Sequence, residues 1–275
     1  MSVLTQAAAS QRTRQTAPMR SIARLLEPLN EMSGTSPNLI VGSAGRFESH
    51  GATYELPRYT FIGPKGGDEP IRVGIFAAIH GDEPAGAYAL VQFLQILEQH
   101  PSFASGYCLF VYPLCNPTGF EDDTRNSRRG RDLNREFWRG SAEPEVRLLQ
   151  AELAAHKFHG IISLHADDTS HGTYGYAHGA TLTKDLLRPA LEAAELLLPL
   201  NQNDTIDGFV ARDGIIREGY QGILSAPPEV RPRPFEIVFE TPQAAPQHLQ
   251  EKALVVALET ILAEYRKFIA YAPNL

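Results

Sequence analysis

The chain has 275 residues, of which 43% are hydrophobic and 21% are charged, so it can bury the core of one large domain or two small ones. No uninterrupted apolar run approaches the ~20 residues that a membrane span requires, which excludes a transmembrane protein, and we expect no membrane partner. The net charge of −7 argues against nucleic acid as a partner, because a general nucleic-acid-binding protein carries a basic face. Two cysteines, Cys108 and Cys115, are too few for a disulfide framework and suit a cytoplasmic location.

The N-terminal stretch is expected to be flexible over residues 1–18, and a short helix is expected over 19–31. Residues 1–26 contain four arginines and no acidic residue, a composition that transit peptides share. The stretch has no apolar segment and no convincing cleavage site of the kind found in secretory signals. We therefore favour a frayed end of the chain over a targeting sequence.

From residue 52 onward, strand-like and helix-like segments alternate along the chain. Short runs rich in apolar residues predict strands at 54–62, 71–79, 107–112, 160–165 and 235–240. Wider apolar stripes predict helices at 84–100, 145–157, 182–200 and 246–269, and Gly66, Gly67 and Asp68 predict a turn. No linker or internal repeat divides the chain. The pattern predicts a single α/β domain over residues 19–275, with helices on both faces of a central, largely parallel twisted sheet.

Three polar clusters lie at the carboxyl ends of predicted strands, where ligands collect in open α/β sheets. Two of them contain histidine, in His80-Gly-Asp-Glu83 and in Leu164-His165-Ala-Asp167. An isolated histidine would indicate only a core residue, but two histidines and a carboxylate form a three-ligand zinc site with a fourth position open to water. The sequence therefore predicts a metal site made of His80, Glu83 and His165.

The third cluster contains Glu240, which directly follows the apolar residues Ile237, Val238 and Phe239. An unpaired carboxylate would be costly to bury at such a position. A structural ion pair with a nearby arginine is one explanation. We favour the other, a general base that accepts a proton from an activated water and later passes it to the leaving amine.

Six of the twenty arginines lie between Arg125 and Arg139, although the protein is acidic overall. A solvated surface accounts adequately for Arg129 and Arg139, but it accounts poorly for the segment Asp132-Leu-Asn-Arg135. An arginine binds a carboxylate with two parallel hydrogen bonds, and a neighbouring asparagine amide can add another. This segment therefore indicates a site for a substrate carboxylate.

Taken in order, these motifs resemble those of the zinc carboxypeptidases, a superfamily that includes the succinylglutamate desuccinylase and aspartoacylase branch. The matching motifs span about residues 70 to 245 and are His80-Gly-Asp-Glu83, Asn116-Pro-Thr-Gly-Phe120, Thr124-Arg125, Asp132-Leu-Asn-Arg135, Leu164-His165 and Phe239-Glu240. The resemblance implies a mixed eight-stranded sheet with helices on both faces and one catalytic Zn²⁺ per chain.

The resemblance also implies roles for individual residues. The residues that match the zinc ligands are His80, Glu83 and His165. Glu240 matches the general base, and Asn134 and Arg135 match the anchor for the terminal carboxylate of the substrate. Asp132 matches a carboxylate that does not bind the metal itself. It orients the first zinc histidine by accepting a hydrogen bond from its other ring nitrogen.

Some roles remain open within the resemblance. The arginine that polarises the substrate carbonyl could be Arg125 or Arg128, and we favour Arg125. Arg128 and Tyr220 are further candidates for substrate binding; Tyr220 lies near the place of the family's mobile capping tyrosine, although a packed loop tyrosine fits equally well. Asp167 and Asp168 follow the second histidine and could contact substrate, favour a cationic group, or help to bind a second metal.

We therefore expect a zinc-dependent metallohydrolase that cleaves an amide bond next to a free carboxylate. Its substrate could be a short peptide, as for a carboxypeptidase, or an N-acyl amino acid, as for a desuccinylase or aspartoacylase. Surplus arginines at 128, 129 and 131 favour a small anionic substrate, whereas the motif set favours the carboxypeptidases, which we prefer. A non-catalytic module that binds carboxylates is a remote alternative, since neither a ligand nor the base is missing.

Overall fold

The computed structural model describes residues 20–64 and 69–271. The flexible segment expected over 1–18 and the turn expected at 66–68 lie outside the described residues. All the helices and strands predicted from residue 19 onward are found, with ends that shift by a few residues in most cases. Within the described ranges, no helix combines the length and the apolar character needed to cross a membrane.

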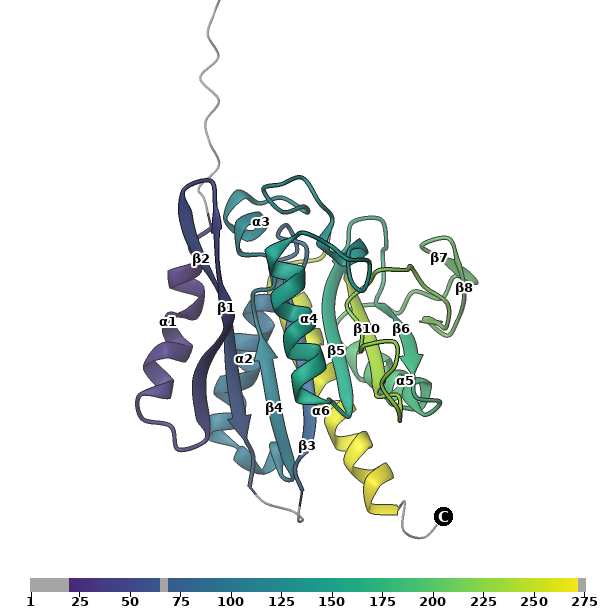
Figure 1. Ribbon diagram of the computed structural model, residues 1–275. Coiled ribbons are helices and arrows are strands. Elements are labelled where there is room, and N and C mark those ends of the chain that lie inside the picture. The colour runs from purple at the N-terminus through teal and green to yellow at the C-terminus, as the bar shows by residue number, and fades with distance from the viewer. Residues whose placement is uncertain (1–19, 65–68, 272–275) are drawn as a thin grey trace, which may run out of the picture.

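One mixed sheet of ten strands forms the centre of the described structure, in the order β1-β2-β4-β3-β5-β10-β6-β9-β8-β7 (Figure 1). The strands are β1 (Leu39–Ser49), β2 (Ala52–Ile62), β3 (Ile71–Ala77), β4 (Tyr107–Tyr112), β5 (Gly160–Asp167), β6 (Tyr174–Gly179), β7 (Thr205–Ile206), β8 (Phe209–Arg212), β9 (Ile215–Ile216) and β10 (Phe235–Pro242). The strands β4, β3, β5 and β10 are parallel to one another, so their carboxyl ends meet at one edge of the sheet.

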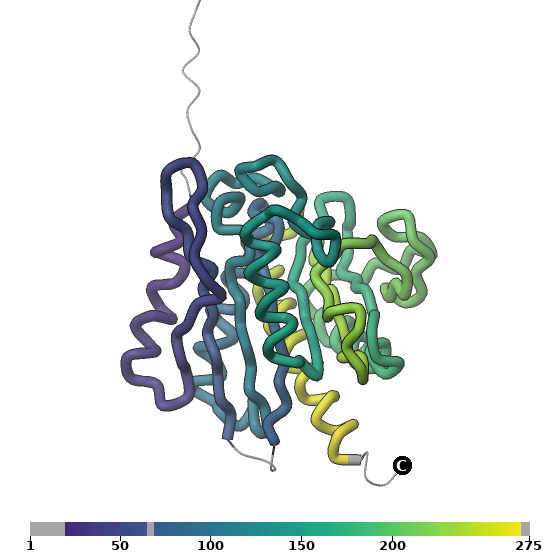
Figure 2. The backbone as a smooth tube through the Cα atoms, viewed as in Figure 1, coloured from purple at the N-terminus to yellow at the C-terminus, as the bar shows by residue number. Residues whose placement is uncertain are grey.

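Helices cover both faces of this sheet, as Figures 1 and 2 show. The α-helices of the described residues are α1 (Ile22–Ser33), α2 (Ala85–Gln99), α3 (Pro117–Asp122), α4 (Pro144–His156), α5 (Thr183–Ala194) and α6 (Gln247–Tyr271). Buried side chains of α1, α2, α5 and α6 join one hydrophobic cluster, and those of α4 join a second cluster on the opposite face. The predicted layering of helices around a central sheet is confirmed.

The two central strands explain why the ligand-bearing segments are so well anchored. Nearly every residue of β3 and β5 is buried, because helices cover both of their faces. Val73 and Ile75 of β3 pack with α2 and α6, whereas Phe76 stacks on Tyr112 at a ring-centroid distance of 4.5 Å on the α4 side. A site at the carboxyl ends of these strands therefore stands on buried strands that are packed on both faces.

The sheet has ten strands and not the eight that the resemblance implied, and its parallel pairing is confined to the centre and to the β6–β9 pair. The strands β7, β8 and β9 were not predicted, and they are only two to four residues long. Strands this short have no periodicity that a sequence pattern could reveal. The strand β6 was also missed, because its Gly-Tyr-Gly sequence has the composition of a loop.

Two further elements differ from the prediction. The strand β1 was missed because it carries Gly42 and Gly45 around a β-bulge and leaves Ile40 54% exposed, so its apolar alternation is weak. The helix predicted over 182–200 ends at Ala194, before Pro199. At Pro199 the chain instead pairs with Thr173, whose backbone N–H donates to the carbonyl of Pro199 at 2.7 Å.

Candidate metal centre and active site

The turn that follows β3 carries the first two candidate ligands. Ala78 adopts a left-handed backbone conformation with φ 50°, which turns the chain sharply away from the sheet. Gly81 is required because a Cβ at this position would lie 1.9 Å from the backbone carbon of Gly119. This close approach brings His80 and Glu83 to the carboxyl edge of the sheet, directly before α2.

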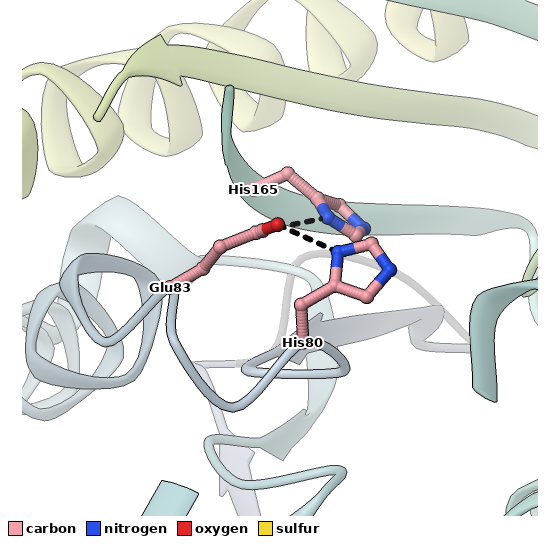
Figure 3. Close-up of side chains that lie close together, drawn as sticks. All are labelled: His80, Glu83 and His165. Carbon is pink, nitrogen blue, oxygen red and sulfur yellow. Dashed lines mark hydrogen bonds and ion pairs between the residues drawn. The ribbon is translucent and has the colours of Figure 1, made fainter. Parts of the chain in front are cut away.

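The third candidate ligand, His165, comes from β5, the strand that pairs with β3 (Figure 3). His80 Nδ1 lies 2.6 Å from Glu83 Oε1, and His165 Nδ1 lies 2.9 Å from Glu83 Oε2. The three residues are 3%, 4% and 3% exposed, and their ligand atoms all lie within 4.8 Å of one another. Residues separated by more than eighty positions in the chain thus form one compact cluster.

The orientation of the two imidazole rings fits a metal centre. Nδ1 of each ring faces Glu83, while Nε2 of His80 lies 3.1 Å from Asp132 Oδ1. A ligating imidazole in metalloproteins is commonly held in this way, with its outer nitrogen bonded to a carboxylate. Two imidazoles and one carboxylate are a donor set suited to Zn²⁺. Within the described ranges, no comparable group of three donors includes Asp167 or Asp168.

The charges of the cluster also suit a cation. Burial disfavours an ionised Glu83, but the two adjacent histidines outweigh burial and lower the pKa of this carboxyl group. For His80, the neighbouring carboxylates outweigh burial and raise its pKa, whereas burial dominates for His165 and lowers its pKa. An anionic carboxylate and a neutral imidazole are the forms that bind a divalent metal. The pKa shifts of Glu83 and His165 favour these forms, whereas His80 would release a proton when a metal binds.

Asp132 links the histidine to Arg125. Its Oδ2 accepts hydrogen bonds from Arg125 Nε at 3.2 Å and from Arg125 Nη2 at 3.1 Å, while its Oδ1 lies next to His80. Nη1 of Arg125 also donates to Glu83 Oε1 at 3.3 Å. The predicted position of Asp132 beside the first histidine is therefore observed, and the same carboxylate orients the guanidinium of Arg125.

The short 3-10 helix Leu133–Arg135 directs the next two candidates into the same region. Asn134 Oδ1 accepts a hydrogen bond from the backbone N–H of Leu224 at 2.8 Å, which fixes the amide. The guanidinium carbon of Arg135 lies 4.0 Å from the centroid of the Tyr220 ring. Asn134, Arg135 and Tyr220 all line one cavity with the candidate ligands.

Glu240 lies on β10 between the two neighbouring strands. It is in register with His165 of β5 on one side and with Tyr174 of β6 on the other. No ion pair or hydrogen bond of its carboxylate occurs within the described part of the chain, so the alternative of a structural ion pair has no support. Burial raises the pKa of Glu240, and the nearby carboxylates of Glu83 and Asp167 raise it further. Such a group can hold a proton and release it.

The cavity that these residues surround has a volume of about 410 Å³, a size suited to a small ligand. It is lined by His80, Asp82, Glu83, Arg125, Asn134, Arg135, His165, Ala166, Asp167, Asp168, Thr169, Tyr174, Tyr176, Asp207, Tyr220, Ile223, Val238, Glu240 and Gln243. With the exception of Arg128 and of Asp132, which lies behind His80, every candidate site residue predicted from the sequence is on this wall.

Arg128 lies elsewhere. Its Nε donates to Asp122 Oδ2 at 2.6 Å and its Nη2 lies 3.3 Å from Glu121 Oε2, while the guanidinium packs over the ring of Tyr54. It is not among the residues that line the cavity. Of the two arginines considered for the carbonyl, Arg125 is therefore the one in the cavity.

Several lining residues were not singled out from the sequence, among them Tyr174, Tyr176, Asp207 and Gln243. Tyr174 and Tyr176 alternate along β6 at the spacing of residues on one face of a strand. Asp207 precedes Gly208, and an Asp-Gly pair is a strong signal for a tight hairpin turn. That signal could have revealed the β7–β8 hairpin and with it Asp207.

Known structures confirm this architecture. A candidate metallopeptidase from Shewanella amazonensis SB2B is 25% identical, with a TM-score of 0.73 over 88% of this chain and 92% of that chain. A second one, from Shewanella denitrificans OS217, is 24% identical, with a TM-score of 0.73 over 92% of this chain and 98% of that chain. A metallo-carboxypeptidase from Burkholderia cenocepacia is 16% identical, with a TM-score of 0.71 over 91% and 70% of the two chains.

Comparison by sequence places the chain in a family. No protein of curated function shows significant sequence similarity to it. The profile of the succinylglutamate desuccinylase/aspartoacylase catalytic domain, however, matches residues 70–207, which is half of the chain and includes the three candidate ligands. The protein therefore belongs to the succinylglutamate desuccinylase/aspartoacylase family, and it shares its fold with the metallo-carboxypeptidase from Burkholderia cenocepacia.

Proposed function

We propose that this protein is a zinc-dependent hydrolase that cleaves an amide bond next to a free carboxylate. The observation that carries the proposal is the buried cluster of His80, Glu83 and His165 with Glu240 in register beside it. A metal site and a carboxyl group able to carry protons share one cavity with two arginines. Family membership supports the same class of chemistry.

His80, Glu83 and His165 would hold the ion. Zn²⁺ at such a centre lowers the pKa of a bound water from 15.7 to roughly 7 and polarises a carbonyl group. Glu240 would accept the proton of the attacking water and then deliver it to the departing nitrogen. Arg125, held by Asp132, would donate hydrogen bonds to the carbonyl oxygen as negative charge develops there.

Asn134 and Arg135 would bind the carboxylate of the substrate. Arg135 presents a guanidinium to the cavity, and Asn134 lines the same cavity with its Oδ1 held by the backbone N–H of Leu224. A planar guanidinium forms two parallel hydrogen bonds with a carboxylate, which fixes both the position and the orientation of the substrate. The scissile bond would then lie between this anchor and the metal.

The charge of the cavity favours a peptide-like substrate over a dianion. Besides Glu83, five carboxylate residues line it (Asp82, Asp167, Asp168, Asp207 and Glu240), against two arginines. The surplus arginines at 128, 129 and 131, which favoured a small anionic substrate, are not lining residues. A second carboxylate on the substrate would meet repulsion from these acidic side chains. We therefore prefer a carboxypeptidase-like activity.

An N-acyl amino acid deacylase is the second candidate. It is favoured by the family profile, which is that of desuccinylases and aspartoacylases. Arg125 and Arg135 would bind one carboxylate each, as a dianion such as an N-succinyl amino acid requires. The two candidates thus differ in the acyl side of the substrate, which is a peptide for the carboxypeptidase and a small acyl group such as acetyl or succinyl for the deacylase.

A competition assay separates them. Zinc-loaded protein is incubated with pooled short peptides bearing free carboxyl ends together with N-acetyl and N-succinyl amino acids, and the products are identified by mass spectrometry. Release of a C-terminal amino acid supports the carboxypeptidase, and release of acetate or succinate supports the deacylase. Binding of these compounds without zinc-dependent hydrolysis would instead support a module that only captures carboxylates.

A further inference from the structure

The guanidinium of Arg135 is held by an aromatic ring and not by an acid. It lies over the Tyr220 ring at 4.0 Å, and its Nη1 donates to the backbone carbonyl of Asn134 at 2.9 Å. No ion pair of Arg135 with a carboxylate occurs in the described residues. The charge of Arg135 is therefore available to a ligand, while its direction depends on the position of Tyr220.

Tyr220 itself is tied down through Asp207. It is 38% exposed and lies in a segment without regular secondary structure, so the backbone around it gives little support. Its hydroxyl donates to Asp207 Oδ1 at 2.9 Å, and its ring meets Phe209 edge-on at 4.9 Å. The other oxygen, Asp207 Oδ2, accepts a hydrogen bond of 2.6 Å from the buried Tyr176 of β6.

The local backbone fixes Asp207 in this place. Ile206 pairs with Phe209, so Asp207 and Gly208 form a two-residue hairpin turn. Their φ angles are 52° and 80°, the positive values that such a turn requires. Asp, Asn and Gly tolerate this conformation, but Gly has no side chain with which to accept the two tyrosine hydroxyl groups.

We propose that Asp207 is a positioning residue that fixes Tyr220 beneath Arg135 and thereby directs the guanidinium towards the substrate carboxylate. The proposal rests on the proposed function, because it assumes that Arg135 binds this carboxylate. Asp207 acts through Tyr220 and Arg135 and does not itself touch the substrate. Tyr176 of β6 holds Asp207, Asp207 holds Tyr220, and Tyr220 supports Arg135. The exposed Tyr220 is thereby tied to the central sheet.

This role predicts an effect opposite in sign to that of simple charge. Asp207 is negative, so Coulomb repulsion alone would make its removal strengthen the binding of a carboxylate. Positioning predicts the reverse, since Asp207→Gly keeps the turn but releases Tyr220. Asp207→Asn also removes the charge, yet it keeps the turn and retains groups that hydrogen-bond to both hydroxyls.

The test compares these variants on zinc-loaded protein with N-acetyl-dialanine and N-acetyl-alanine, each also as its C-terminal amide. We expect Asp207→Gly to raise KM for the free-carboxylate compound by on the order of tenfold with kcat within about twofold, because the anchor binds substrate and transition state alike. Asp207→Asn should restore a KM close to that of the wild type. Neither variant should change the weaker hydrolysis of the amide.

Asp213→Gly is the matched control. Asp213 and Gly214 form the same kind of turn, with φ angles of 52° and 71°, between the paired residues Arg212 and Ile215. The Asp213 side chain only pairs with the exposed Arg188 and does not line the cavity. This variant should behave as wild type, which separates the role of the Asp207 carboxylate from the effect of glycine in a hairpin.

A second measurement does not depend on turnover. The Arg135 Nε–H resonance in ¹⁵N spectra should show the upfield ring-current shift of a group above an aromatic face, and Asp207→Gly should abolish it. A lower KM in both Asp207 variants, an equal effect on the amide, or an unchanged Arg135 resonance would overturn the proposal. Failure of the wild-type protein to hydrolyse either compound would instead overturn the proposed function on which it rests.

Discussion

At the scale of single residues, Glu240 shows how strand register places a carboxyl group beside the candidate ligands. It faces the same cavity as His165 because the two residues are in register on neighbouring parallel strands. Its carboxylate has no cationic partner among the described residues, and burial raises its pKa. A carboxyl group in this state is poorly suited to hold structure together and well suited to exchange protons.

Glu240→Gln should therefore abolish turnover but leave metal binding intact. We expect a loss of about 10²–10⁴-fold in kcat, because the amide keeps the shape of the side chain but cannot accept a proton. Zinc content is measured by atomic absorption. Turnover is measured on the substrate that the competition assay identifies. Glu218→Gln, at an exposed position that does not line the cavity, is the matched control. Near-normal turnover of Glu240→Gln would remove this residue from the mechanism.

Asp132 contacts the candidate metal centre without supplying one of its ligands. Its two oxygens contact His80 and Arg125 on opposite sides. Asp132→Ala should weaken zinc binding by about 10–100-fold, because the imidazole of His80 loses the group that orients it. Competition with a chromophoric chelator measures the affinity.

Asp168→Ala removes an equal charge from the wall of the neighbouring cavity and serves as the control for this variant. Asp168 is exposed and makes no contact with the candidate ligands in the described structure. If both variants bound zinc equally well, orientation by Asp132 would be unimportant.

At the scale of the element, α4 contains a carboxyl group that works against the folded state at alkaline pH. Glu145 lies in the first turn of this helix, is 2% exposed, and leaves Oε2 without a hydrogen-bond partner in the described structure. A carboxylate near a helix N-terminus is normally favourable. Here burial outweighs that effect and, together with nearby Glu143, raises the pKa of Glu145 to about 7.

This shift predicts a pH dependence of stability with a definite sign. Between the ordinary glutamate pKa of 4.5, which applies to the unfolded chain, and the folded-state pKa of about 7, the folded chain keeps a proton that the unfolded chain has released. The free energy of unfolding should therefore fall as pH rises through this range, by about 2 kcal/mol between pH 5 and pH 8 from this group.

Glu145→Gln should flatten the dependence, because the amide does not ionise. Urea unfolding at pH 5 and pH 8 measures it, and Glu192→Gln, an exposed position on α5, is the control. For each protein, the change in the free energy of unfolding between pH 5 and pH 8 is determined. The change in each variant is then compared with that in the wild type, because other groups titrate in the same pH range. An equal slope in Glu145→Gln and wild type would contradict the prediction.

At the scale of the whole molecule, the candidate metal centre joins segments that the chain keeps far apart. His80 and Glu83 follow β3, and His165 lies near the end of β5, so an ion would tie two central strands together at their carboxyl ends (Figure 3). Without the ion, two histidines and a buried carboxylate must satisfy one another. Metal binding should therefore be coupled to global stability.

Removal of zinc with a chelator should lower Tm, and re-addition should restore it. A metal present at a thousand times its Kd stabilises the folded state by about 4 kcal/mol, which corresponds to a shift on the order of 10 °C for a chain of this size. Differential scanning calorimetry with and without added zinc measures the shift. Glu83→Gln removes one candidate ligand and should abolish the zinc dependence, whereas a zinc-dependent Tm in that variant would argue for a metal bound elsewhere.

The sequence by itself determined the fold class and the principal members of the site. Strands buried on both faces are apolar nearly throughout, so β3, β5 and β10 and the polar residues that end them stand out locally. In a parallel arrangement these ends must meet, which is why His80, Glu83, His165 and Glu240 could be predicted to converge.

Only the tertiary structure shows which charged side chains are paired with other residues of the chain and which face the cavity. Six arginines look alike in the sequence, but Arg128 is taken up by Asp122 and Glu121, while Arg135 rests on an aromatic ring and faces the cavity. The Asp207-Gly208 pair marks a turn in the sequence, but only the tertiary structure shows that this turn places Asp207 in the cavity. Local periodicity reports which elements form, whereas the partners of a charged side chain depend on contacts between distant segments of the chain.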